Sequence, residues 1–393
     1  MPLGLGAGLS KSGIVTPGIV TDNLVLKHKY DAGAVVPVSD GAAYFDGAND
    51  YILMADDNTL DMGTGSFTLT AWVKTESGRT SDKIINKWAN DGTGGEPGGY
   101  FMFVANDGKL RFRVDDGGNT DNTNYVVFSG TSLINDGNWH FCTCVYETNT
   151  SMKIYVDGIL EATDTTNPPS IGDIDNSLGL RIGLNEASGE DLKGYVCNVG
   201  IWTSVLTQAQ IKSIMWKNYA GLTDSEKANL VSWWNLDSSE SDVEGNGIVH
   251  DNHYGGSTEL GSELLTNGSL DTGDISGWNA GSSGDGTTPY YDNGGIRIKS
   301  GASGGNSYIH QGVLTQGGIY EISYEIRENN GGTLSLEDDG TTTLASTVGV
   351  HTIRWYFNDS DSSMVIKRSA ANTDILIDNI SCKILQGNPG KLT

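Results

Sequence analysis

Short apolar runs alternate with clusters of Thr, Ser, Asn, Asp and Gly along the whole chain, about every eight to twelve residues. This spacing predicts antiparallel strands joined by turns, and therefore an all-β fold built from sandwiches. The clearest runs are Phe67–Val73, Tyr100–Ala105 and Leu110–Val114. The last two flank Asn106-Asp107-Gly108, a sequence typical of a hairpin turn.

Residues 194–211 predict a strand that runs directly into a capped helix. Side chains on a strand alternate with period two, which predicts one shared face for Tyr195, Cys197, Val199 and Ile201. Thr207 and Gln210 form a capping-box pattern at the start of the helix. Apolar residues at helical spacing continue to Tyr219, and Gly221 predicts the end of the helix.

Several blocks of the first half occur in an order that resembles one known family. They are Phe45-Asp46-Gly47, Phe67–Val73, Trp139-His140 and residues 153–158, followed by the strand and helix of residues 194–211. In this order they resemble the laminin-G-like and pentraxin-like concanavalin A-like jelly rolls. The resemblance implies a β-sandwich with a short helix that binds sugars or other proteins and seldom performs catalysis.

One block stands in an unusual place. Relatives carry a segment like Leu230–Asp237 before the first block, whereas here it follows the helix. We therefore expect a circularly permuted jelly roll over residues 39–260, in which this segment returns to supply missing strands. The alternative is a truncated second copy, which would leave an unpaired sheet edge.

Two further parts of the chain complete the expected organisation. Residues 263–278 and 373–381 resemble the opening and the close of family 4/9-type carbohydrate-binding modules, which implies a second jelly-roll sandwich over residues 261–387 and a tail at 388–393. Residues 1–38 lack long periodicity and predict an extended N-terminal arm. Such an arm either docks on a larger assembly by strand addition or forms a floppy terminus.

Composition narrows the choice of partners. The formal net charge of −25 disfavours nucleic acid, whose phosphates would be repelled. No apolar run is long enough for membrane insertion. The first residues lack the pattern of a secretory signal, from which we expect a particle assembled inside a cell and released by lysis, such as a virion.

The cysteines do not predict a disulfide framework. Cys142, Cys144 and Cys197 fit buried free thiols better than disulfides.

The sequence predicts no catalytic residues, because the paired carboxylates of concanavalin-like glycosidases are missing. Calcium is the candidate cofactor, since hard cations prefer carboxylate and amide oxygens on loops. By resemblance to pentraxins the candidate ligands are Asn90, Asp91, Glu186 and Asp191. By resemblance to the carbohydrate-binding modules they are Asp271 and Asp378, as a structural calcium site. The alternative is a set of solvated acidic loops.

Sugar binding requires exposed aromatic rings flanked by polar groups. Trp88, Tyr290 and Tyr291 stand in polar, loop-like contexts and are the candidates, with ordinary packing as the alternative. Four other tryptophans occupy core positions of the families and are expected to be buried: Trp72, Trp139, Trp202 and Trp278.

Together these observations predict a phage virion protein, a capsid decoration or head-fibre protein that residues 1–38 attach to the capsid or another virion protein. Its two sandwiches would bind host-surface or environmental polysaccharide from the particle surface, as a homo-oligomer and by analogy a trimer. The alternatives are a tail-fibre protein or bacterial surface lectin or adhesin, and an accessory module of a polysaccharide-degrading enzyme.

Overall fold

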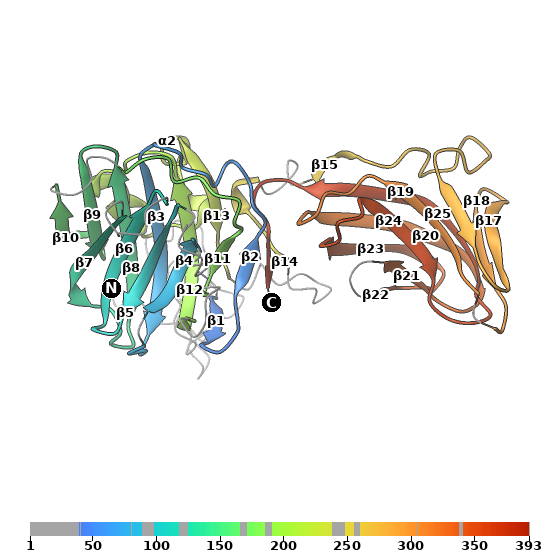
Figure 1. Ribbon diagram of the computed structural model, residues 1–393, viewed down its shortest axis with the longest axis horizontal. Coiled ribbons are helices and arrows are strands. Elements are labelled where there is room, and N and C mark those ends of the chain that lie inside the picture. The colour runs from blue at the N-terminus through green and yellow to red at the C-terminus, as the bar shows by residue number, and fades with distance from the viewer. Residues whose placement is uncertain are drawn as a thin grey trace, which may run out of the picture. The chain divides into compact units, whose positions relative to one another are not determined.

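Strands dominate the structure, a computed structural model, which confirms the predicted all-β fold (Figure 1). It describes residues 39, 41–79, 81–88, 98–117, 125–165, 171–184, 191–237, 248–254, 260–303, 305–337 and 341–392. The predicted arm at residues 1–38 lies outside this part of the chain. None of the helices in the described ranges is long and apolar enough to span a membrane.

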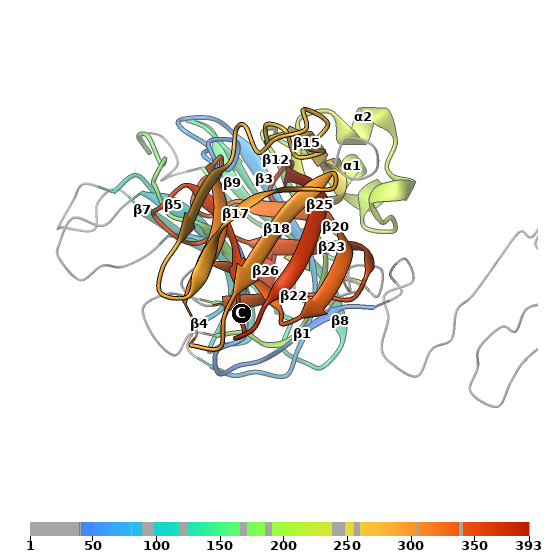
Figure 2. The same ribbon diagram turned by 90° about the vertical axis from the view of Figure 1, so that its right-hand side faces the viewer.

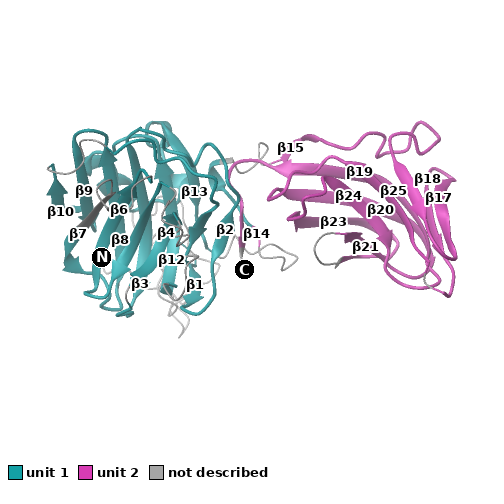
Figure 3. Cartoon of the chain, viewed as in Figure 1, with its two compact units in different colours: residues 1–241, 249–253, 392–393 teal, residues 242–248, 254–391 magenta. Residues whose placement is uncertain are grey.

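The chain divides into two compact units, coloured separately in Figure 3. The first comprises residues 1–241, 249–253 and 392–393, and the second comprises residues 242–248 and 254–391. Each unit contains two antiparallel sheets with a buried apolar core.

The first sheet of unit 1 has seven strands in the order β1-β12-β3-β8-β9-β10, with β13 paired to β12. Its strands are β1 (Ala43–Asp46), β3 (Phe67–Thr75), β8 (Trp139–Glu147), β9 (Ser151–Val156), β10 (Ile159–Asp164), β12 (Lys193–Trp202) and β13 (Leu230–Trp234). The predicted return of residues 230–237 is thus observed, because β13 pairs with the second half of β12.

Six strands of unit 1 form its second sheet in the order β2-β11-β4-β5-β6-β7. They are β2 (Ile52–Met54), β4 (Ser81–Lys87), β5 (Gly99–Ala105), β6 (Lys109–Asp115), β7 (Tyr125–Leu133) and β11 (Leu180–Ile182). The residues of β14 (Ile248–Val249) and of β26 (Gly390–Leu392) are divided between the two units. The predicted hairpin is confirmed as β5 and β6. Strand β26 forms within the segment that the sequence analysis assigned to a tail.

Strand β3 shows how alternation builds the core of unit 1. Phe67, Leu69, Ala71 and Val73 are fully buried in the core, and the alternate residues of the strand point to the outer face of the seven-stranded sheet. Removing these side chains from water is the main favourable term for the fold. The four cysteines are buried and unpaired, and burial raises the pKa of Cys197 to about 12.

A bulge in β12 reverses the face that its side chains occupy. The strand advances three residues from Cys197 to Gly200 while β3 advances two, and Asn198 adopts a left-handed conformation with φ of 50°. One extra residue shifts every later side chain to the opposite face. Tyr195 and Cys197 therefore lie on the outer face, while Val199 and Ile201 point to the core. The prediction of one shared face is wrong for this reason.

Two short helices, close together in Figure 2, follow β12. They are α1 (Gln208–Ile214) and α2 (Asp224–Lys227), with 3₁₀ turns at Tyr219–Gly221 and Asn252–Tyr254. The capping box is confirmed, because the Thr207 backbone N–H donates to Gln210 Oε1 over 2.9 Å and the Thr207 hydroxyl oxygen accepts from the Gln210 N–H. The helix is shorter than predicted, since Tyr219 belongs to a separate turn capped by Asn218.

Unit 2 also consists of two sheets. The six-stranded sheet has the order β17-β18-β25-β20-β23 with β15 on β25, and the five-stranded sheet has the order β16-β19-β24-β21-β22. The first contains β15 (Leu260–Glu263), β17 (Gly286–Asp292), β18 (Gly295–Ser300), β20 (Ile319–Gly331), β23 (Gly349–Tyr356) and β25 (Asp374–Leu385). The second contains β16 (Asn279–Ser282), β19 (Ser307–Gly312), β21 (Leu334–Glu337), β22 (Thr341–Leu344) and β24 (Ser363–Arg368). Trp278, Ile296, Tyr324 and Ile366 lie in its core.

Candidate functional site

Four side chains form a row across the outer face of the seven-stranded sheet of unit 1. Tyr44 on β1 lies directly opposite Tyr195 on β12, which lies opposite Lys74 on β3, which in turn lies opposite Trp139 on β8. Residues directly opposite in antiparallel strands share one face. We call Tyr44, Tyr195, Lys74 and Trp139 the aromatic row.

The rings of the aromatic row contact one another and remain accessible. The ring centroids of Tyr44 and Tyr195 lie 4.8 Å apart, and those of Tyr195 and Trp139 lie 6.3 Å apart. Tyr44 is 51% exposed and Tyr195 is 39% exposed. Trp139 is half-buried, so the expectation of full burial is wrong at this position, whereas Trp72, Trp202 and Trp278 are buried as predicted.

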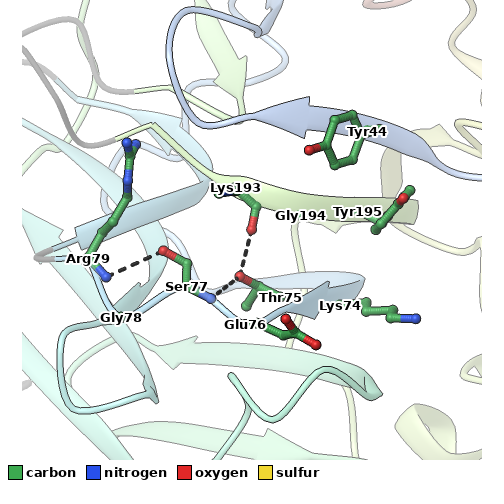
Figure 4. A pocket seen from close by; sticks show the side chains of 10 residues that line it. All are labelled: Tyr44, Lys74, Thr75, Glu76, Ser77, Gly78, Arg79, Lys193, Gly194 and Tyr195. Atoms are coloured by element: carbon green, nitrogen blue, oxygen red, sulfur yellow. Dashed lines mark hydrogen bonds between the residues drawn. The ribbon is translucent and has the colours of Figure 1, made fainter.

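A cavity of about 570 Å³ adjoins the row, lined by Tyr44 and by residues 74–79 and 193–195 (Figure 4). Hydrogen bonds hold its wall in place. The Thr75 hydroxyl donates to Lys193 O over 2.6 Å and accepts from the Ser77 N–H at 2.9 Å. Ser77 Oγ accepts in turn from the Arg79 N–H at 3.3 Å. The chain that follows β3 is thereby fixed against β12.

Charges of both signs surround the cavity. Lys74, Arg79 and Lys193 supply the positive charges and Glu76 supplies a negative charge. The Arg79 guanidinium donates to the backbone oxygens of Gly47 and Asp191, the latter over 3.2 Å. Arg79 is therefore anchored to the wall.

A buried carboxyl lies near this wall. Burial is the largest cause that raises the pKa of Asp82, and the nearby Ser77 and the charge of Arg79 partly oppose it. Because Asp82 is fully buried, it does not contact a ligand in the cavity. It packs behind the wall and interacts electrostatically with Arg79.

The arrangement is suited to binding polar ring compounds. Exposed aromatic faces with an adjoining polar cavity provide apolar contact area together with hydrogen-bonding groups. Among the residues that line the cavity, Glu76 carries the one carboxylate. Glycoside hydrolysis ordinarily requires a pair of carboxyl groups flanking the bond. The groups that line the cavity therefore favour ligand binding over glycoside hydrolysis.

The aromatic residues singled out from the sequence have different environments. Trp88 is 5% exposed, packs on Phe101, and has the Arg113 guanidinium 4.6 Å from its ring centroid, so it lacks the exposed face that sugar stacking requires. Strand alternation in β17 turns Tyr290 outward, where it is 40% exposed, and turns Tyr291 toward the core of unit 2. Of the three candidates, Tyr290 presents its ring to solvent.

Of the four calcium candidates in unit 1, only Asp191 lies among the described residues. Asn90, Asp91 and Glu186 lie outside the described residues. The Asp191 side chain is 4% exposed and its backbone oxygen accepts from Arg79. Among the residues that the structure places, no three His, Cys, Asp or Glu side chains group as a metal site would require.

In unit 2 the two calcium candidates have protein partners. Asp378 Oδ2 lies 3.2 Å from the Arg327 guanidinium, and Asp378 Oδ1 accepts from the Asn379 N–H at 2.7 Å. Asp271 accepts from the Ser269 hydroxyl over 2.8 Å. The Arg327 guanidinium thus occupies one side of the Asp378 carboxylate, and a calcium ion bound there would have to displace it. Calcium at Asp271 and Asp378 stays a prediction.

Sequence reasoning missed Tyr44 and Tyr195 as site residues. The signal for Tyr44 was present, because Phe45 fits the core and its neighbour on a strand must point outward. The signal for Tyr195 was weaker, because its face depends on the bulge at Asn198.

Comparison with known proteins finds one family profile that is similar to part of the chain. The Laminin_G_3 family profile, described as "Concanavalin A-like lectin/glucanases superfamily", matches residues 46–212, fewer than half of the 393 residues. No curated protein matches the chain in sequence.

Several solved structures resemble the chain at low identity. A Bacteroides ovatus protein described as carbohydrate binding has 20% identity and a TM-score of 0.40, over 55% of this chain and 56% of that chain. The chain thus spans little more than half the length of that protein. The heptameric SAP-like pentraxin of Limulus polyphemus has 18% identity and a TM-score of 0.35, over 46% of this chain and 83% of that chain. Domain 4 of AbnA, an arabinanase of Geobacillus stearothermophilus, has 18% identity and a TM-score of 0.33, over 47% and 82% respectively.

Proposed function

We propose that this chain is a non-catalytic glycan-binding protein whose principal binding site is the aromatic row with its adjoining cavity. The match of residues 46–212 to a profile of concanavalin A-like lectins and glucanases supports this proposal. The observation that carries the proposal is the exposed pair Tyr44 and Tyr195, whose tilted rings have centroids 4.8 Å apart beside a cavity of about 570 Å³. Large rings exposed together are unusual unless they serve an interaction.

The physical basis is the match between ring surfaces and sugars. The apolar face of a pyranose packs on an aromatic ring, and the hydroxyls at its rim form hydrogen bonds with neighbouring polar groups. Lys74 supplies such a group within the row, and Glu76 and Ser77 supply others in the cavity. Aromatic rings of the row are already ordered by their mutual contacts, which reduces the entropy lost on binding.

A glycan array probed with the full chain tests this function. We expect binding by the unmodified chain and loss of the signal in the double variant Tyr44→Ala/Tyr195→Ala. Trp216→Ala is the matched control, because Trp216 is 52% exposed and packs on Trp72 outside the row. Thermal melting must show that all three proteins are folded. An unchanged array signal in the double variant contradicts the proposal.

The alternative is an accessory module of a polysaccharide-degrading enzyme, in which glycan binding would serve catalysis by another domain or protein. In that case the same row would hold polysaccharide near a catalytic partner, and this chain alone would release no reducing sugar. Measurable release from the bound polysaccharide by the pure chain would contradict a non-catalytic role.

The proposed biological setting is the surface of a phage particle, where residues 1–38 attach the chain to the capsid or another virion protein, with a tail-fibre or bacterial surface adhesin as the alternative. The support is the composition of residues 1–38, which lack long periodicity. Deleting residues 1–38 should abolish association with the particle and leave glycan binding intact. Association that survives the deletion would contradict attachment through the arm.

A further inference from the structure

The aromatic row crosses the strands of the sheet instead of following one strand, and this direction bears on the shape of the ligand. Its members come from β1, β12, β3 and β8, which are neighbours in that order. Neighbouring strands lie about 4.8 Å apart. Tyr44 and Tyr195 come from adjacent strands with ring centroids 4.8 Å apart, whereas Trp139 lies two strands beyond Tyr195 and leans toward it, with a centroid distance of 6.3 Å. The three rings are therefore in contact from Tyr44 through Tyr195 to Trp139.

We infer that the row binds an internal run of about three sugar units of a neutral, linear polysaccharide, with the polymer lying across the strands. This inference rests on the proposed glycan-binding function and specifies its ligand. Three rings in line offer three successive stacking positions, whereas recognition of a single terminal sugar would need one ring and an enclosing pocket.

The aromatic row is open at the Tyr44 end, which supports binding to an internal run of sugar units. Strand β1 is the outermost strand of the sheet path, and Tyr44 on it is the most exposed of the three rings. A polymer stacked on the row can therefore continue past Tyr44 beyond the edge of the sheet. The increasing exposure from Trp139 to Tyr195 to Tyr44 gives the row one sheltered end and one open end.

The charges around the row support a neutral ligand. Asp46 lies directly opposite Lys193, Glu76 lines the same cavity as Lys74, and Arg79 is bound to two backbone oxygens. Two carboxylates thus lie among the three cations Lys74, Arg79 and Lys193, so the local net charge is small. The whole chain carries a net charge of −25, which repels a polyanion at long range.

Lys74 provides the polar contact inside the row. It lies between Tyr195 and Trp139 in register and is half-buried. Among the residues that the structure describes, no carboxylate pairs with its ammonium group. The ammonium group is therefore available to donate hydrogen bonds to sugar hydroxyls between two stacking positions.

The test is a titration of the full chain with oligosaccharides of one to six units, in neutral hexose, neutral pentose and uronate series. We expect affinity to rise roughly tenfold or more from one unit to three and to change little beyond that. Tyr44→Ala should remove most of the affinity gained between two units and three. Uronate chains should bind more weakly than neutral chains of equal length.

The outcomes separate this inference from the function on which it rests. Binding that depends on Tyr195 but is equal for one and six units, or stronger for uronates, would overturn the inference alone. Binding by no series, or binding unaffected by Tyr195→Ala, would overturn the glycan-binding function as well. Tyr195→Phe serves as the conservative variant and should retain the affinity and the length dependence, because it keeps the ring.

Discussion

The ammonium group of Lys87 lies 2.8 Å from Asp56 Oδ1, although the Lys87 side chain is only 1% exposed. Asp61 Oδ1 lies 3.0 Å from the same nitrogen, and the backbone oxygens of Asn176 and Leu178 accept from it at 3.1 and 2.7 Å. A buried charge is tolerated only when it is paired and hydrogen-bonded. Lys87 therefore ties β4 to the chain after β2 and to the chain before β11.

Replacing Lys87 with Met should lower the free energy of unfolding by about 3 kcal/mol, because two carboxylates and two carbonyls lose their common partner. Urea denaturation measures the change. Lys153→Met is the matched control, since Lys153 pairs with Glu147 at 3.0 Å but is 26% exposed. The control should lose about 1 kcal/mol or less. Equal effects of the two substitutions would contradict the account of Lys87.

His140 should make stability depend on pH. Its Nδ1 lies 2.9 Å from Asp157 and its Nε2 lies 3.1 Å from Asp136, and the hydrogen bond with Asp157 is the largest cause that raises its pKa. A raised pKa in the folded state means that the protonated imidazole stabilises the fold. This stabilisation is complete below the ordinary histidine value near 6.5 and is lost as pH rises through the folded value.

Melting temperatures measured across this window check the effect. The unmodified chain should lose stability as pH rises from below about 6.5 into the alkaline range, and His140→Gln should show a flatter profile. NMR titration of His140 gives its pKa directly. A value at or below the ordinary one would refute the prediction.

Gly194 is required where β12 passes β3 beside the cavity. A Cβ at this position would collide with the Lys74 backbone oxygen and lie 3.0 Å from Thr75 Cβ. Gly194→Ala should therefore destabilise the protein by about 1–3 kcal/mol and weaken glycan binding by displacing Tyr195. Gly221→Ala is the control, because its nearest neighbour would be at 3.4 Å, an ordinary contact. Similar melting temperatures for both variants would contradict the argument.

Calcium at Asp378 would have to displace Arg327, which already pairs with this carboxylate. If the prediction of this site holds, added calcium should raise the melting temperature of the unmodified chain more than that of Asp378→Asn. Differential scanning calorimetry in EDTA and in calcium chloride measures both shifts. Equal shifts in the two proteins would contradict calcium at Asp378. Calcium at Asn90, Asp91, Glu186 and Asp191 stays a separate prediction.

We predict that Tyr290 is a second contact for long polymers. It is 40% exposed and lies opposite Arg297, which Asp292 and Glu328 hold at 2.7 and 2.6 Å. Tyr290→Ala should weaken binding to intact polysaccharide by loss of a second attachment and leave binding of trisaccharides unchanged. Surface plasmon resonance on immobilised polymer compares the unmodified chain with Tyr290→Ala. Equal polymer binding by the two proteins would show that Tyr290 does not contribute to binding.

How much of the structure could be predicted from the sequence depends on how far apart along the chain the interacting residues lie. Strands, the hairpin and the capping box depend on neighbouring residues, so alternation and spacing were sufficient to identify them. The outward face of Tyr195 depends on a single left-handed residue, Asn198, which the apolar pattern does not reveal. Burial of Trp88 depends on Phe101 and Arg113, which come from the neighbouring strands β5 and β6. Such contacts between strands are outside the reach of a local pattern.

Hydroxyl-radical footprinting with mass spectrometry is the most direct test of the central claim, because it locates a bound glycan without any substitution. The full chain is oxidised with and without the neutral oligosaccharide that binds best. The account predicts strong protection of Tyr44 and Tyr195 and unchanged oxidation of Trp216. Full oxidation of Tyr195 in the presence of saturating ligand would contradict it.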